Sequence, residues 1–85
     1  MNVRKKAYGD RNMVGRKIEM LRTARGIYQK DMAARMQTLG CDINITSYSK
    51  LEGQFRSAND REIYTIAKIL NVSIDELFKP IPHNE

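Results

Sequence analysis

The sequence has no tryptophan, one cysteine, one histidine and two prolines in 85 residues. A single cysteine, Cys41, excludes an internal disulfide and a cysteine-rich zinc site. The only histidine, His83, has no accompanying serine, cysteine or carboxylate pattern typical of a catalytic triad. We therefore expect no metal, no cofactor and no enzymatic activity, and a core that is held together by packing alone.

Long apolar runs are also missing. No stretch approaches the roughly 20 apolar residues that cross a bilayer. The first residues, MNVRKKAYGDRN, carry positive charges without the apolar segment of a secretory signal. We expect a cytoplasmic protein with no membrane contact. With 41% hydrophobic and 29% charged residues, the composition is that of a globular protein, and the length allows one domain.

The charged residues are unevenly distributed. Fifteen Lys and Arg residues against ten Asp and Glu residues give a formal net charge of +5. Residues 1–30 contain nine basic and two acidic residues, whereas residues 60–85 contain three basic and five acidic residues. A basic end of this kind is typical of proteins that bind nucleic acid, although a solvated basic surface without a ligand has the same composition.

Helical periodicity extends through most of the chain, and no segment alternates as a strand does. Apolar residues spaced at i, i+3, i+4 and i+7, together with capping residues and glycines, predict five helices. They are expected to begin near Asn12, Gln29, Asn44, Asn59 and Ser73. The sequence therefore predicts an all-α fold, a compact bundle of five short helices.

Two of these helices begin with the spacing of a capping box, in which an N-cap side chain and an acid three residues later bond to each other's backbone. The pairs are Asn59 with Glu62, and Ser73 with Glu76. Three apolar residues of the last helix are expected to close the core: Ile74, Leu77 and Phe78.

The segment 45–52 separates into two faces when its residues are placed about 100° apart. Tyr48 and Leu51 fall on an arc that is expected to pack. The opposite arc carries four residues that are expected to be free: Ile45, Thr46, Ser49 and Lys50. A helix fits the DNA major groove, where such side chains contact base edges. The alternative is an ordinary surface helix with one exposed isoleucine.

Two runs of sequence carry a resemblance to a known family: GRKIEMLRTARGIYQKDMAARM and INITSYSKLEGQFRSANDREIYTIAKILNVSIDELF. The order of their aliphatic, Arg, Gly, Gln, Ala and Glu positions resembles the lambda-repressor-like helix-turn-helix family of the Cro and XRE type, which comprises phage and bacterial repressors. The resemblance covers Met13 to Phe78. It implies a sequence-specific double-stranded DNA-binding protein, a bacterial or phage transcriptional regulator, with a recognition helix over about residues 45–52.

The resemblance also implies roles for single residues. Gln29 would contact the DNA backbone at the start of the second helix, with Lys30 beside it, and Asn44 would cap the recognition helix. Arg56, in the following loop, would reach a phosphate. The residues that would face the groove are those of the free arc: Ile45, Thr46, Ser49 and Lys50.

A structural pair between Arg22 and Glu52 is implied as well, and it would fix the recognition helix against the first helix. Three features depart from the family pattern, and one of them lies in the recognition helix, where Gly53 directly follows Glu52 and Ile45 replaces the amides or arginines of many relatives. Between Met36 and Asn44 the chain has about five more residues than the short family turn, so either the second helix is longer or the turn bulges. Tyr28 stands where the family has Ser, Thr or Asn, so the first N–H groups of that helix need another partner, for which phosphate is a candidate.

These observations predict three segments: a basic N-terminal arm over residues 1–11, a DNA-binding domain over residues 12–79, and a short C-terminal tail over residues 80–85. One recognition helix reads only a few base pairs, so we expect a homodimer on the DNA. The alternative, from another class, is a protein-interaction module such as an antitoxin or adaptor that keeps the fold without using the groove face.

Overall fold

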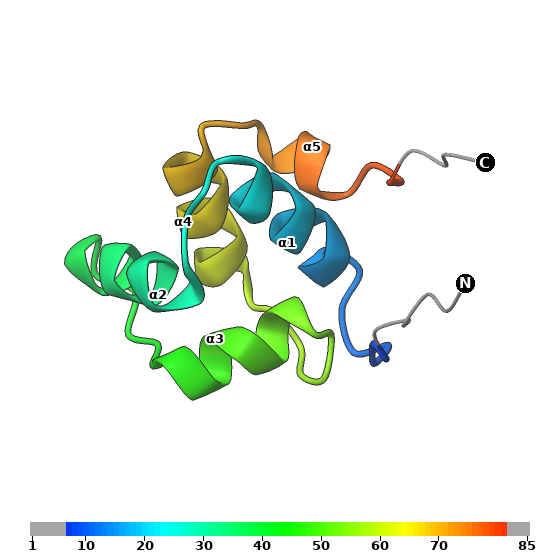
Figure 1. Cartoon of the computed structure of the whole chain (residues 1–85), viewed down its shortest axis with the longest axis horizontal. Coiled ribbons are helices and arrows are strands. Elements are labelled where there is room, and N and C mark those ends of the chain that lie inside the picture. Colours follow the sequence, from blue (N-terminus) through cyan, green and yellow to red (C-terminus); the bar gives the residue numbers. More distant parts are fainter. Residues whose placement is uncertain (1–6, 82–85) are drawn as a thin grey trace.

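The computed structural model describes residues 7–81 of the chain, and Figure 1 shows the five helices of this range. They are α1 (Gly15–Ala24), α2 (Gln29–Thr38), α3 (Ile45–Glu52), α4 (Asp60–Leu70) and α5 (Ile74–Leu77). Between residues 7 and 81 there is no strand. The all-α bundle of five short helices predicted from the periodicity is confirmed.

Side chains cap the N-termini of α3, α4 and α5. The capping box of α4 is confirmed: Asn59 Oδ1 accepts from Glu62 N at 2.8 Å, and Glu62 Oε1 accepts from Asn59 N at 3.0 Å. At α5 only half of the predicted box forms, because Ser73 Oγ accepts from Glu76 N while the Glu76 carboxylate lies 3.2 Å from Lys17 Nζ. Lys17 is buried, and a buried ammonium group requires an acidic partner.

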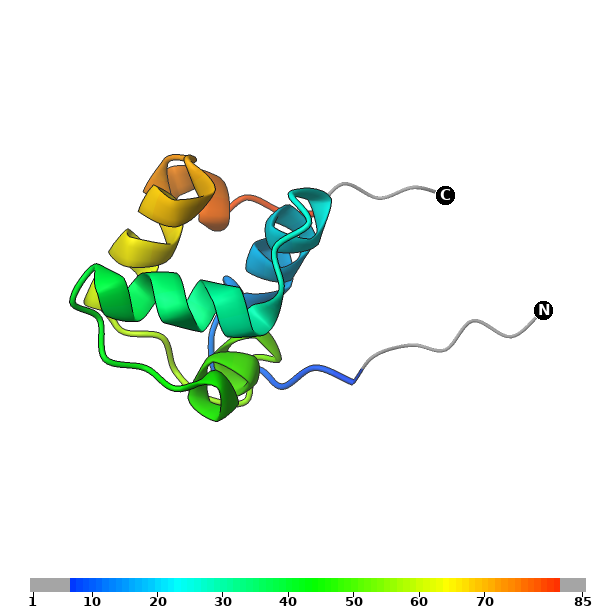
Figure 2. The same ribbon diagram turned by 60° about the vertical axis from the view of Figure 1, so that its left-hand side comes forward.

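The core lies between the helices. α4 packs against α1, α2 and α5, while α3 packs against α1 and α2 (Figures 1 and 2). The core side chains with no exposed surface are Ile18, Met32, Met36, Tyr48, Leu51, Ile66, Leu70 and Leu77. Of the three residues expected to close the core from the last helix, Leu77 does so, but Ile74 and Phe78 are exposed. At about 100° per residue, Ile74 and Phe78 lie roughly 60° and 100° around the helix from Leu77, so burial of Leu77 leaves both at the edge of the packed face.

The connection between α2 and α3 is a structured turn. α2 ends at Thr38 and α3 begins at Ile45, so residues 39–44 form the connection. Gly40 takes a φ of 87°, a left-handed conformation that favours glycine. Cys41 and Ile43 are buried beneath the turn, and Gln37 Nε2 donates to the Ile43 carbonyl. Two inward apolar side chains therefore tie the turn to the core.

The N-terminal segment of the described range joins the end of α3. Gly9 N donates to the Gly53 carbonyl and Arg11 N to the Gln54 carbonyl, both at 2.9 Å. Asn12 Oδ1 accepts from the backbone N–H groups at the start of α1. Residues 7–11, assigned to an arm from the sequence, thus pack with the domain; the basic residues at 4–6 and His83 lie outside the described residues.

Within the described range, no helix combines the length and apolar character that crossing a membrane requires.

Candidate nucleic-acid interface

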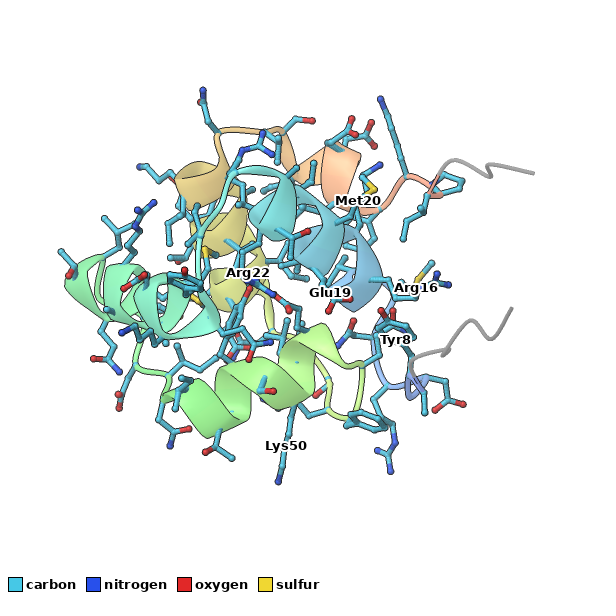
Figure 3. All side chains as sticks on the ribbon, in the orientation of Figure 1. Tyr8, Arg16, Glu19, Met20, Arg22 and Lys50 are labelled. Atoms are coloured by element: carbon cyan, nitrogen blue, oxygen red, sulfur yellow. The ribbon has the colours of Figure 1, made fainter. Side chains whose placement is uncertain are left out.

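The outer face of α3 carries the four residues that the helix geometry predicts. Ile45, Thr46, Ser49 and Lys50 are all exposed, and the Ile45 side chain is 48% exposed although it is apolar. Figure 3 shows the Lys50 side chain projecting from α3 away from the other helices. On the opposite face, Tyr48 and Leu51 are fully buried. One face of α3 therefore packs and the other is free, as predicted.

Asn44 sets the beginning of this helix. Its Oδ1 accepts a hydrogen bond from Ser47 N at 2.8 Å, and its backbone is extended with a ψ of 171°. The side chain satisfies one of the N–H groups that a helix start leaves without a partner. Asn44 therefore caps α3, which is the structural role that the resemblance implies.

The end of α3 is fixed by a buried carboxylate, Glu52, which is 2% exposed. Arg22 of α1 donates to it twice, from Nε to Oε2 at 2.7 Å and from Nη2 to Oε1 at 2.9 Å. Tyr48 Oη donates to Oε2 at 2.5 Å, and Gln29 Nε2 donates to Oε1 at 2.9 Å. The implied pair of Arg22 with Glu52 is present, and two further donors complete it. We call these four residues the Glu52 cluster.

Burial alone would raise the pKa of Glu52, because it disfavours the charged form. The hydrogen bonds from Arg22, Tyr48 and Gln29 outweigh burial, so the pKa of this carboxyl lies below its ordinary value. Burial and the adjacent carboxylate both raise the pKa of the Tyr48 phenol. At neutral pH the cluster thus contains a carboxylate, a neutral phenol and a guanidinium group, and it joins α1, α2 and α3.

Gln29 joins this cluster from the start of α2. One N–H of its side-chain amide donates to Glu52, and a contact of Gln29 with the DNA backbone stays a prediction. A buried carboxylate benefits more from a third donor than a solvated phosphate does. The neighbouring Lys30 is exposed, and Tyr28 at the N-cap of α2 provides no side-chain cap. Lys30 and the backbone N–H groups at the start of α2 are therefore further candidates for contact with a phosphate.

Arg56 also bonds to groups within the domain. Its guanidinium group binds the Glu62 carboxylate through both terminal nitrogens, while Nε donates to Ser47 Oγ at 2.9 Å. Nη1 donates in addition to the Ser57 carbonyl. The side chain is 27% exposed and connects the start of α3 to the start of α4. The buried Glu62 carboxylate thus accepts from both terminal nitrogens of Arg56, and a contact of Arg56 with a phosphate stays a prediction.

Two features of the site were missed by sequence reasoning. A Cβ atom on Gly15 would lie 2.5 Å from the Glu52 carbonyl oxygen and 2.7 Å from that of Leu51, so α1 begins in direct contact with the end of α3. Gln54, with a left-handed φ of 65°, donates from Nε2 to the Gly9 carbonyl and accepts from Arg16 N. In the sequence, only the glycine at the start of α1 could have indicated the first of these contacts.

A second polar group lies at the N-terminal side of α1. Tyr8 Oη donates to Glu19 Oε1 at 2.5 Å, and the guanidinium carbon of Arg16 lies 4.9 Å from the centre of the Tyr8 ring. Figure 3 shows Tyr8 beneath Arg16 and Glu19. These contacts tie residues 7–11 to α1 as well as to α3. Among residues 7–81, no three His, Cys, Asp or Glu side chains are grouped as a metal site requires.

Comparisons with protein-family models, with curated proteins and with solved structures find no match for this chain. The resemblance to the Cro and XRE type therefore rests on the residues alone and stays a prediction.

Proposed function

We propose that this protein binds double-stranded DNA sequence-specifically, as a cytoplasmic bacterial or phage transcriptional regulator, with α2 and α3 as a helix-turn-helix pair and α3 in the major groove. One observation carries the proposal: the free face of α3 stands on a helix whose other face is fixed to α1 and α2 by the Glu52 cluster. A reading helix must be held rigidly, because base contacts depend on its orientation.

The exposed side chains suit base edges. Lys50 can donate to guanine O6 and N7 or to a phosphate, and Ile45 can contact the thymine methyl group. Thr46 and Ser49 carry hydroxyl groups that both donate and accept, so they tolerate several bases. Lys30 and the uncapped N-terminus of α2 would face the phosphate backbone. The basic first third of the chain adds attraction that does not depend on base sequence.

The proposed complex contains two subunits. Four side chains on one short helix specify only a few base pairs, too few to select one site in a genome. A homodimer would place two copies of α3 in successive major grooves about 34 Å apart, on an inverted repeat with half-site centres roughly 10 base pairs apart.

Selection of bound duplexes from a random library tests the proposal and defines the site together. On the selected duplex, Lys50→Ala and Thr46→Ala should each bind more weakly by about 1–3 kcal/mol, roughly 5- to 150-fold. Lys79→Ala is the matched control, since it removes an equal charge from the far end of the fold. Circular dichroism should show the same helix content in all variants. Unchanged affinity in both α3 variants removes α3 from the interface.

The alternative is a protein-interaction module, and exposed apolar side chains before α2, on α3 and after α3 favour it: Tyr28, Ile45 and Phe55. Salt concentration separates the two functions. Binding to phosphates weakens steeply as salt is added, because the protein releases counterions from the DNA and this release is less favourable at higher salt; an apolar protein interface changes little.

A further inference from the structure

We propose that a groove between α4, α5 and the turn after α2 is the surface through which two copies of this chain associate. The inference deepens the proposed function, which supplies the need for a second copy. The groove has a volume of about 580 Å³, and its walls include Leu39, Asp60, Arg61, Tyr64 and Ile74. Three of these are large apolar residues with 52%, 56% and 43% exposure: Leu39, Tyr64 and Ile74. Such a cluster marks an interaction site more often than single exposed residues do.

The turn between α2 and α3 builds part of this groove. Leu39 and Gly40 line it from one side, while the buried Cys41 and Ile43 hold the turn in place. Lys68 Nζ lies over the Tyr64 ring at 5.5 Å from its centre, and the Tyr64 side chain lines the groove and is 56% exposed. The turn after α2 therefore contributes an exposed apolar residue, Leu39, to the groove.

The charges at the groove favour a second copy as the occupant. A chain with a net charge of +5 repels its copies wherever basic surfaces meet, so self-association needs a balanced surface. The groove has an acid and a base side by side, Asp60 and Arg61, both exposed and on the first turn of α4. In a twofold interface Asp60 of each copy can meet Arg61 of the other, because the same patch serves on both sides. Tyr64, the most exposed of the apolar residues, enters the facing groove.

The surface is compatible with DNA binding by the same molecule. The groove walls come from α4, the start of α5 and the turn after α2, and none of the residues that line it belongs to α3. Occupation of the groove by a second copy therefore leaves the free face of α3 available, and the two proposals concern different residues.

Sedimentation equilibrium of the full chain without DNA tests the inference up to millimolar concentration. The mean mass of the wild-type protein should rise toward that of a dimer. Asp60→Arg and Arg61→Asp should each abolish this rise, because like charges then face each other. A mixture of the two variants should associate, and so should the double swap D60R/R61D, because both restore opposite pairs across the interface. Arg25→Asp, with an equal charge change outside the groove, should behave as wild type.

Tyr64→Ser provides a second test that leaves the helix start unaltered, and it should weaken association while thermal melts confirm folding. A monomer mass at every wild-type concentration overturns the inference, as does association of both single-charge variants at wild-type strength. Either result leaves DNA binding untouched, since that is measured on α3 variants. If the charge variants associate as expected but no duplex is selected from the random library, the groove is supported as the dimer surface and the proposed function is refuted.

Discussion

Removal of Arg22 provides the sharpest test of how α3 is held. Arg22→Ala deletes two hydrogen bonds to the Glu52 carboxylate and a third, from Nη1 to the Ile27 carbonyl at 2.6 Å. Breaking a buried ion pair by removing one partner costs about 3–5 kcal/mol. Tyr48 and Gln29 still donate to the carboxylate, which favours the lower end, about 3 kcal/mol. Domains have a total stability of roughly 5–15 kcal/mol, so this loss is a large fraction.

The assay is thermal unfolding followed by circular dichroism. In a domain of this size, 1 kcal/mol lowers the melting temperature by about 4–8 °C, so a loss of 3 kcal/mol lowers it by about 12–24 °C. Arg25→Ala is the matched control: it removes an exposed arginine from the end of the same helix, whose guanidinium group donates only to the Leu21 carbonyl. Equal melting temperatures for the two variants would refute the reasoning, because they would mean that the Glu52 cluster is not buried in solution.

The pH dependence supplies an independent check. In the wild type, the pKa of Glu52 is lower in the folded state than its ordinary value, so its stabilisation is complete above the unfolded pKa and is lost as pH falls through the folded one. In Arg22→Ala, burial still raises the pKa while the strongest donor is gone, so protonation at low pH favours the folded state. The difference in free energy of unfolding between the wild type and Arg22→Ala should therefore be smaller at pH 4 than at pH 7. Glu62 and Glu76 titrate in both proteins and cancel in the difference.

Two further changes test the packing of the helices. Gly15→Ala should lower the melting temperature by the equivalent of about 1–3 kcal/mol, although alanine favours helices, because its Cβ meets the backbone of α3; a higher melting temperature would show that α1 and α3 are not in direct contact. Asn59→Ala should cost about 1 kcal/mol in urea unfolding, since it removes the cap from Glu62 N, and an unaltered midpoint would mean that the α4 capping box contributes nothing.

Features that depend on one segment alone could be predicted from the sequence. The two faces of α3 follow from a rotation of about 100° per residue, and Tyr48, Leu51, Ile45 and Lys50 fall on the expected sides. The Asn59 cap likewise needs only the residue three positions later. For these features, local geometry settles which groups meet, so no knowledge of the tertiary structure is needed.

Contacts that depend on the approach of distant segments were not predicted. The bonds of Arg56 to Glu62 and Ser47 exist only once α3 and α4 have packed, and nothing in the sequence indicated them. The bond of Gln29 to Glu52 likewise requires α2 and α3 to meet, and the DNA contacts that the resemblance implies for both residues stay predictions. A long polar side chain on a helix end can reach solvent or a buried charge, and its sequence neighbours do not distinguish these outcomes.

The bonds of Arg56 and Gln29 indicate that α3 is held rigidly in the domain. Arg56 ties Ser47, near the start of α3, to α4, while Gln29 and Arg22 tie Glu52, at its end, to α2 and α1. The helix is therefore held at both ends by charged hydrogen bonds, and its free face contributes to neither attachment. It follows that exchanges of side chains on this face should leave stability unchanged and, under the proposed function, should alter which bases they contact. By contrast, any change at Glu52, Arg22 or Arg56 should alter stability and the orientation of the whole face together.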